Sequence, residues 1–201
     1  MQCLYYPRSI YDGETLTCPC GQQSRNSKEV IEHALRCYRF SNIATATRHQ
    51  FLKTALANTC RSYGITVTVE PNFYAYPDSA VRHRPDLTFW IKNTPVVTDV
   101  TIVLPTDDIG TAAIRAANDK VDLHAISAAD NGHEFIPFAV ENDGKLDSRC
   151  TTLFKRIAAD VPRRMRTMLF RDLFGSTSTS IAYYRALAVK NACRTPTTMY
   201  F

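Results

Sequence analysis

The alternation of apolar and polar positions predicts a helix and then one or two strands before the middle of the chain. Apolar side chains recur at helical spacing over residues 45–63, and Gly64 stands where a C-terminal cap is expected. Over residues 65–69, apolar side chains alternate with threonines, which is typical of a strand, and Pro71 ends it. The aromatic-rich residues 72–76 indicate a second strand.

Two short apolar runs follow, at residues 87–91 and 96–104, with the polar residues 92–95 between them. A connection of this kind predicts a β-hairpin. The second run ends at residues 105–108, where an aspartate would be a favourable N-cap for the alanine-rich helix predicted at residues 109–127.

The last third of the chain predicts one more strand and then helices. The strand covers residues 135–140, and its internal Pro137 favours an edge or bulged position because proline donates no ladder hydrogen bond. Gly175 and the Ser/Thr residues after it predict a break between the last two helices. The predicted helices cover residues 146–161, 163–174 and 181–193. This succession of elements predicts an α/β domain with a mixed sheet.

The 201 residues, 45% of them apolar, are enough for one sizeable core and a small appended module. No run of 18 apolar residues predicts a membrane span, and the N-terminus lacks a signal-peptide pattern, so we expect a soluble intracellular protein. The chain also lacks a Walker phosphate loop, a dinucleotide fingerprint and a serine nucleophile elbow.

A net charge of +5 favours a polyanionic partner. Basic side chains gather in two places, and solvated helix faces are the alternative interpretation of the second one. The two groups are Arg82, His83 and Arg84, and then Lys155, Arg156, Arg163, Arg164, Arg166 and Arg171.

Four residues of metal-binding types, three cysteines and one histidine, fall in one short segment. Cys18 and Cys20 are followed after twelve residues by His33 and after three more by Cys37. Such a set suits a closed tetrahedral Zn²⁺ site, and the last two residues would face the same way on a short helix at residues 29–37. Cys3 is an alternative for one ligand. The odd count of seven cysteines argues against a disulfide scaffold.

Two aspartates stand at apolar strands, where a carboxylate is costly unless it is paired or bound to a cation. Asp86 follows Pro85, twelve residues separate it from Asp99, and a hairpin would bring both carboxylates to one end of the sheet. Two such oxygen ligands, with water and phosphate, suit Mg²⁺. The alternative is that Asp86 is a strand-start cap and Asp99 a satisfied buried acid.

The chain resembles the PD-(D/E)XK nuclease superfamily, and more closely the restriction-like endonuclease domain of site-specific non-LTR retrotransposons. The residues that carry the resemblance are, in order, Cys18–Cys37, Arg48-His49, Arg84-Pro85-Asp86, Asp99-Val100-Thr101 and Lys120. The resemblance implies a restriction-endonuclease-like core with a mixed central sheet flanked by helices at residues 44–160. It also implies an N-terminal zinc knuckle at residues 1–43 and a C-terminal helical extension at residues 161–201.

The superfamily's usual lysine, two residues after the second acid, is replaced here by Thr101. In the retrotransposon branch the lysine is displaced to the next helix, which points to Lys120. Ile109, Ala113, Ala116, Lys120 and Leu123 fall on one helical stripe, so Lys120 interrupts an otherwise inward face; a snorkelling lysine is the alternative. Lys92 is a reserve candidate, and Glu70 could supply a third carboxylate.

The resemblance implies a metal-dependent endonuclease that nicks DNA with Mg²⁺ or Mn²⁺, for target-primed integration of a non-LTR element. Asp86, Asp99 and Lys120 would be catalytic, the first two as metal ligands, and Arg48, His49, Arg82 and Arg84 would contact nucleic acid. It further implies that the chain binds DNA, with RNA as a second candidate partner, in the nucleus. The chain would be part of a larger retroelement protein or derived from one. The alternatives are a catalytically inactive nucleic-acid-binding module, motivated by Thr101, and a zinc-stabilised protein-interaction domain.

Overall fold

The computed structural model describes residues 15–71, 84–106 and 108–192, which divide into two compact units. The described part of the smaller unit comprises residues 15–48 and 182–192, and the larger unit lies within residues 49–181. Across these residues no helix has the length and apolar character needed to cross a membrane. The first module boundary expected from the sequence, at residue 43, lies within a helix.

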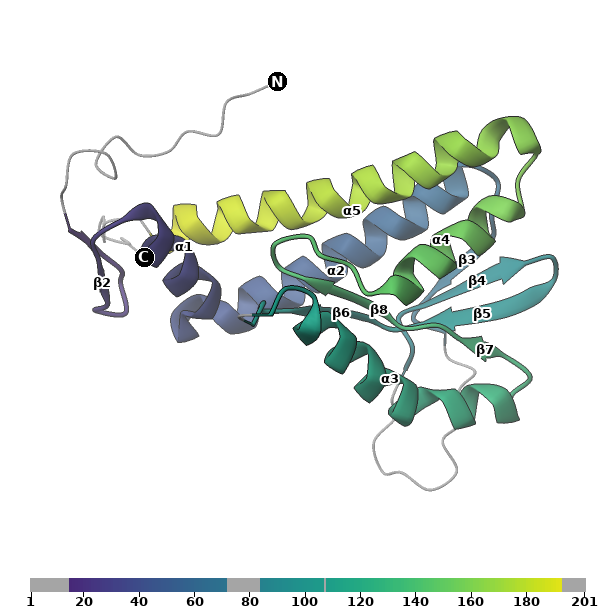
Figure 1. Cartoon of the computed structure of the whole chain (residues 1–201), viewed down its shortest axis with the longest axis horizontal. Helices are drawn as coiled ribbons and strands as arrows, with labels where there is room; N and C mark the ends of the chain where they lie inside the picture. Colours follow the sequence, from purple (N-terminus) through teal and green to yellow (C-terminus); the bar gives the residue numbers. More distant parts are fainter. Residues whose placement is uncertain (1–14, 72–83, 107, 193–201) are drawn as a thin grey trace, which may run out of the picture. The chain divides into compact units, whose positions relative to one another are not determined.

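The larger unit is an α/β structure with a mixed sheet, as predicted (Figure 1). Its main sheet has the strand order β3-β4-β5-β7, antiparallel except for the parallel β5–β7 pair, and a parallel β6–β8 pair accompanies it. The strands are β3 (Val67–Val69), β4 (Leu87–Ile91), β5 (Thr94–Thr98), β6 (Val100–Val103), β7 (Glu134–Phe135) and β8 (Phe138–Glu141). The predicted strand at residues 72–76 lies outside the described residues.

The parallel ladder is interrupted where Asp99 faces Pro137. The same register relates β5 to β7 and β6 to β8, so these two residues lie opposite each other between the two pairs. Backbone hydrogen bonds from Ile136 N to Val97 O and from Phe138 N to Asp99 O flank the break. Because proline has no N–H group, the ladder loses a donor here. The two longer strands predicted from the sequence are therefore each divided in two.

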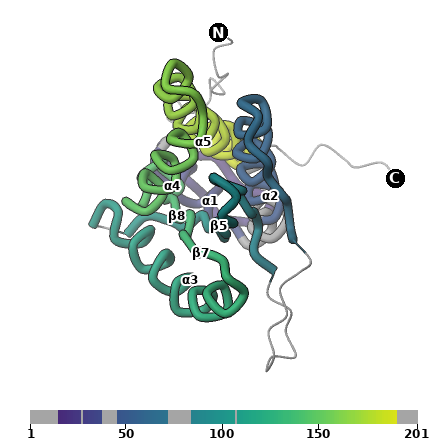
Figure 2. The backbone as a smooth tube through the Cα atoms, turned by 90° about the vertical axis from the view of Figure 1, so that its right-hand side faces the viewer, coloured from purple at the N-terminus to yellow at the C-terminus, as the bar shows by residue number. Residues whose placement is uncertain are grey.

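Both faces of the strands are covered, because neighbouring residues point to opposite sides. Val96, Phe138 and Val140 belong to the main core, whereas Val97 and Ala139 pack on the side of helix α3 (Thr111–Asp130). The main core is completed by α2 (Tyr38–Ser62), α4 (Ser148–Ala159) and the part of α5 (Arg163–Ala192) up to residue 181. Figures 1 and 2 show α3 on one side of the strands and α4 on the other.

The predicted hairpin is confirmed, but its connection is two residues long and not four. Lys92 and Asn93 form the turn with φ of 49° and 64°, and Pro95 already pairs with Trp90 inside the ladder. Two consecutive residues with positive φ are typical of a type I′ turn, whose twist matches that of the flanking strands.

The predicted break at Gly175 is wrong, because α5 continues through it as one helix. The Ser/Thr residues that suggested a loop instead bond back to the helix. Thr177 Oγ1 donates to Leu173 O at 2.8 Å, and Ser180 Oγ donates to Ser176 O at 2.6 Å. Their hydroxyl groups are thereby satisfied in a buried helix face, which sequence alone does not reveal.

The expected aspartate cap of α3 is also wrong. The N-cap residue is Gly110, which has no side chain that could accept a capping hydrogen bond. The fully buried carboxylate of Glu141, at the end of β8, takes this role by accepting from the backbone N–H groups of Gly110, Ala112 and Ala113 at 3.0 to 3.2 Å. A negative charge beside these backbone N–H groups also interacts favourably with the helix dipole. An acid distant in sequence thus fixes where α3 begins.

The smaller unit contains a short β-hairpin and a capped helix. β1 (Leu16–Thr17) pairs antiparallel with β2 (Gln23–Ser24), and α1 (Ser27–Arg36) follows. Asn26 Oδ1 accepts from Glu29 N at 3.0 Å, and Glu29 Oε2 accepts from the N–H of Arg25, the residue before the N-cap, at 2.7 Å, an arrangement similar to a capping box. The next helix begins earlier than the sequence predicted, because α2 starts at Tyr38 and not at residue 45.

Candidate functional site

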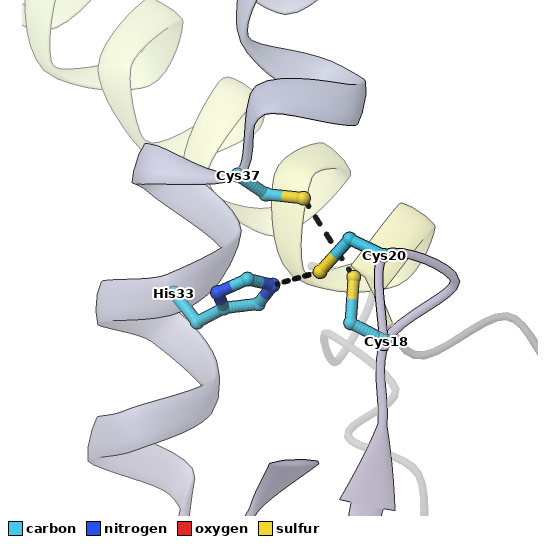
Figure 3. Close-up of side chains that lie close together, drawn as sticks. All are labelled: Cys18, Cys20, His33 and Cys37. Carbon is cyan, nitrogen blue, oxygen red and sulfur yellow. Dashed lines mark hydrogen bonds between the residues drawn. The ribbon is translucent and has the colours of Figure 1, made fainter. Parts of the chain in front are cut away.

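Four side chains of the smaller unit converge on one point. Cys18 and Cys20 lie on the turn after β1, His33 lies on α1, and Cys37 lies at the end of that helix (Figure 3). Cys18 Sγ is 3.7 Å from Cys37 Sγ, Cys20 Sγ is 3.2 Å from His33 Nε2, and all four ligand atoms lie within 4.8 Å of one another. The structure therefore brings together all four ligands predicted from the sequence.

The turn between β1 and β2 fixes the first two thiols. Gly21 takes φ of 95°, a conformation that favours glycine, and donates its N–H to Cys18 O at 2.8 Å. Gln22 N donates to Cys20 Sγ, and this bond lowers the pKa of that thiol. Burial raises the pKa of the Cys18 thiol to about 12. The Cys20 thiol therefore ionises more readily than an ordinary cysteine, whereas the Cys18 thiol needs a bound cation to ionise.

This geometry suits a tetrahedral zinc ion. Zinc–sulfur bonds of about 2.3 Å in a tetrahedron place two sulfurs about 3.8 Å apart, close to the distance between Cys18 and Cys37. Three thiols and one imidazole are soft or borderline donors, which zinc prefers over magnesium. The cluster could hold a metal ion such as zinc and is compatible with a zinc knuckle.

In the larger unit, Asp86 lies immediately before β4 and is 7% exposed. Its Oδ2 accepts from Val100 N at 2.7 Å and lies 2.8 Å from His49 Nε2. Its Oδ1 lies 3.4 Å from Lys53 Nζ, which also contacts Glu70 Oε1 at 2.5 Å. Helix α2 supplies both basic residues, four positions apart, so one helix face serves this carboxylate.

Asp99 occupies the break between β5 and β6 and is likewise 7% exposed. Its Oδ2 lies 2.5 Å from Lys120 Nζ and 3.4 Å from His124 Nε2. These two residues are also four positions apart, on helix α3 on the opposite side of the strands. Each aspartate is therefore paired with one lysine and one histidine of a different helix.

The Asp86 carboxyl group accepts from the N–H of the residue that follows Asp99, so the two acids adjoin and the protonation of one affects the other. Burial, together with neighbouring Asp99, raises the pKa of Asp86. Burial also opposes ionisation of Asp99, but hydrogen bonds from His124, Asp86 and Lys120 outweigh it and hold the pKa of Asp99 below its ordinary value. The hydrogen bond to Asp86 raises the pKa of His49. Such opposed shifts in adjoining acids are typical of functional sites.

Lys120 reaches the acidic pair, but the stripe used to predict this is partly wrong. The buried face of α3 runs through Ala113, Ala117, His124 and Ala128, whereas Ile109 and Leu123 are exposed. The reserve candidate, Lys92, lies in the hairpin turn and is exposed. Glu70 lies beside Lys53, whose ammonium lowers its pKa through a hydrogen bond.

Lys53 and His124 were missed by the sequence analysis. A signal was present in both cases, because each is a basic residue on a mainly apolar helix face and each lies four positions from another basic residue of the site. The spacing shows that such residues share a face. It does not show that two faces from opposite sides of a sheet converge on neighbouring carboxylates.

The residues predicted to contact nucleic acid have separate places. Arg84 is exposed two residues before Asp86, His49 lies at the acidic pair, and Arg48 precedes His49 on α2 in the smaller unit. Burial lowers the pKa of Arg48. Arg82 lies outside the described residues.

The basic residues of the C-terminal third serve different purposes. Arg156 pairs with Glu134, and Arg171 lies 3.7 Å from Asp172. Arg166 donates to the carbonyls of Ala159 and Val161, at 3.2 and 3.1 Å, and so closes the end of α4. Part of this group is therefore structural. Lys155, Arg163 and Arg164 are exposed.

No protein-family model matches the chain, and no curated protein matches it. In the described part of the chain, the Cys18, Cys20, His33 and Cys37 set is the one group of three or more Cys, His, Asp or Glu side chains that could hold a metal ion. The acidic pair offers two adjoining carboxylates.

Proposed function

We propose that the chain is a metal-dependent endonuclease of the restriction-like kind, which nicks DNA at the site formed by Asp86 and Asp99. The observation that carries the proposal is that these carboxyl groups adjoin and that Lys120, from another element, contacts Asp99 at 2.5 Å. Two acids and a lysine are the groups from which such a site is built in the family that the sequence resembles.

The donor chemistry fits one hard divalent cation such as Mg²⁺ or Mn²⁺. Both donors are carboxylates, buried side by side, where a cation offsets the cost of adjoining negative charges. Asp86 and Asp99 would hold the ion, which would lower the pKa of a bound water and stabilise charge on the phosphate. Lys120 is 30% exposed in its side chain and can place its ammonium beside that charge.

Histidine and arginine side chains would position the substrate. His49 is partly exposed at the same carboxylate as the proposed ion, and Arg84 is exposed nearby in sequence. Both can contact phosphate oxygens, with Arg84 able to do so through two parallel hydrogen bonds. Zn²⁺ in the Cys18–Cys37 cluster would stabilise the smaller unit, because metal binding supplies folding free energy that a short segment lacks.

The sequence resemblance gives the biological setting of this proposal. The substrate would be genomic DNA in the nucleus, with RNA as a second candidate ligand, and the chain would belong to or descend from a larger retroelement protein. A nick would expose the DNA end from which the element is copied.

A nucleic-acid-binding module without catalysis is the second candidate. One observation favours it: Asp86 and Asp99 each already have a lysine and a histidine partner, so their charges are compensated without a metal ion. Under this alternative the chain binds DNA with a strong salt dependence but cleaves none.

Nicking of supercoiled plasmid by the full chain, with Mg²⁺ or Mn²⁺, separates the two candidates. We expect metal-dependent nicking that Asp99→Asn abolishes, with DNA affinity retained. Asp143→Asn, in an exposed turn, is the matched control and should nick like the wild type. Equal nicking by the Asp99→Asn variant, or none by the wild type, would contradict the endonuclease proposal.

A further inference from the structure

Lys53 is a buried lysine whose ammonium group joins two carboxylates. It projects from α2, and its Nζ lies 2.5 Å from Glu70 Oε1 and 3.4 Å from Asp86 Oδ1. The side chain is 3% exposed. A charged ammonium is tolerated at such a position only when it is paired, so Lys53 and its two acids depend on one another.

The second lysine of the site is placed differently. Among the acids that the structure describes, Lys120 contacts Asp99 alone, and its side chain is 30% exposed. It can therefore leave the carboxylate and turn toward a bound substrate or solvent. Lys53 has no such freedom, because it is enclosed between the core side of α2 and the acids. Lys53 is thus a permanent part of the site and Lys120 a movable one.

The position of Lys53 bears on how many metal ions the site can take. In two-metal sites the ions lie about 3.5–4 Å apart and share ligands. Asp86 is the acid that two ions would share here, since it adjoins Asp99 and also faces the Lys53 ammonium near Glu70. A second ion at Asp86 and Glu70 would need the oxygen atoms that Lys53 contacts, and the ammonium would repel it.

We propose that Lys53 is a built-in cation of the acidic site, so that Asp86 and Asp99 bind one divalent ion rather than two. This inference rests on the proposed metal-dependent function and specifies its metal stoichiometry. Lys53 is a positioning residue in this role, because it fixes the carboxylates and excludes a second ion without touching the substrate.

The test is a titration of the zinc-loaded full chain with Mn²⁺ in the absence of DNA, with free Mn²⁺ followed by its electron paramagnetic resonance signal. Asp86→Asn, which removes the acid that both ions would share, provides the background to subtract. We expect one Asp86-dependent Mn²⁺ in the wild type and in Lys53→Arg, which keeps the positive charge. Lys53→Met keeps the apolar stem and should bind two, and Lys53→Met combined with Glu70→Gln should return to one.

Thermal unfolding gives a second readout that does not depend on activity. Without Mn²⁺ we expect Lys53→Met to unfold at a lower temperature than the wild type, because two carboxylates lose their cation. Mn²⁺ should then raise the Tm of this variant by more than it raises that of the wild type. If Lys53 had only a structural role, Lys53→Met would have a lower Tm without Mn²⁺ but would gain no more from Mn²⁺ than the wild type does.

Two Asp86-dependent ions on the wild type, or one ion of unchanged affinity on a folded Lys53→Met, would overturn the inference. If Lys53→Met does not fold, the wild-type count decides alone. Two ions together with DNA nicking would leave the proposed function standing and remove the inference. No Asp86-dependent ion and no nicking would remove both.

Discussion

The ammonium of Lys120 lies 2.5 Å from Asp99 Oδ2, and His124, one helical turn further along α3, lies 3.4 Å from the same oxygen. This carboxylate is therefore held by two basic residues of one helix, whereas α2 supplies the corresponding pair for Asp86. A site built in this way connects helices on opposite sides of the strands through two adjoining acids.

Replacement of Lys120 by methionine should separate cleavage from metal binding. We expect kcat for plasmid nicking to fall about 100-fold or more, because a preplaced positive charge beside the reacting phosphate is lost. Mn²⁺ affinity should not fall, since the substitution removes a competing cation. Lys28→Met, an exposed lysine of α1, is the control. Unchanged nicking by Lys120→Met would show that Lys120 has no catalytic role.

Removal of one thiol from the Cys18–Cys37 cluster should release its zinc ion. We expect about one equivalent of zinc in the purified wild type and little in Cys37→Ser, measured by plasma mass spectrometry. Limited proteolysis should then cut the variant within residues 15–48, because the segment loses its metal-derived folding energy. Cys60→Ala, which removes a buried cysteine of the larger unit, should keep its zinc. Equal zinc in Cys37→Ser would contradict the assignment.

The buried carboxylate of Glu141 should contribute measurably to the stability of the larger unit. Glu141→Gln removes the negative charge at three backbone N–H groups and turns an amide toward donors, so we expect a loss of about 1–3 kcal/mol. Urea unfolding measures this loss. Asp143→Asn, two residues away in an exposed turn, should change the free energy of unfolding by less than about 0.5 kcal/mol. Similar values for both variants would show that the cap is unimportant.

The contact between His49 and Asp86 should make stability depend on pH. The hydrogen bond raises the pKa of His49, so the folded chain holds this proton more tightly than the unfolded chain does. The stabilisation is fully present below the unfolded pKa of about 6.5 and is lost as pH rises through the higher folded pKa.

Urea unfolding without added divalent metal, between about pH 6 and 8.5, tests this effect. The wild type should lose more stability than His49→Gln over this range, because the variant lacks the titrating group. The comparison between the two removes contributions from other histidines, such as His133, whose pKa burial lowers. Parallel curves for the two proteins would show that the contact contributes no pH-dependent stability.

Much of the local structure was predictable because it depends on neighbours in sequence. The α/β class, the hairpin before Asp99 and the four converging ligands of the smaller unit followed from periodicity and spacing. The predicted hairpin connection was two residues too long, because neither Lys92 nor Asn93 is a glycine, the residue that usually indicates positive φ in a sequence. That the acidic pair belongs to a nuclease remains a prediction.

The sequence by itself determined which residues share a face of a helix through their spacing, including the basic pairs four residues apart on α2 and α3. Only the tertiary structure decided that these two faces meet at Asp86 and Asp99, that Glu141 caps α3, and that α5 continues past Gly175. The reason is physical: periodicity follows from the backbone geometry of one element. Contacts between elements depend on how buried polar groups find partners across the whole fold.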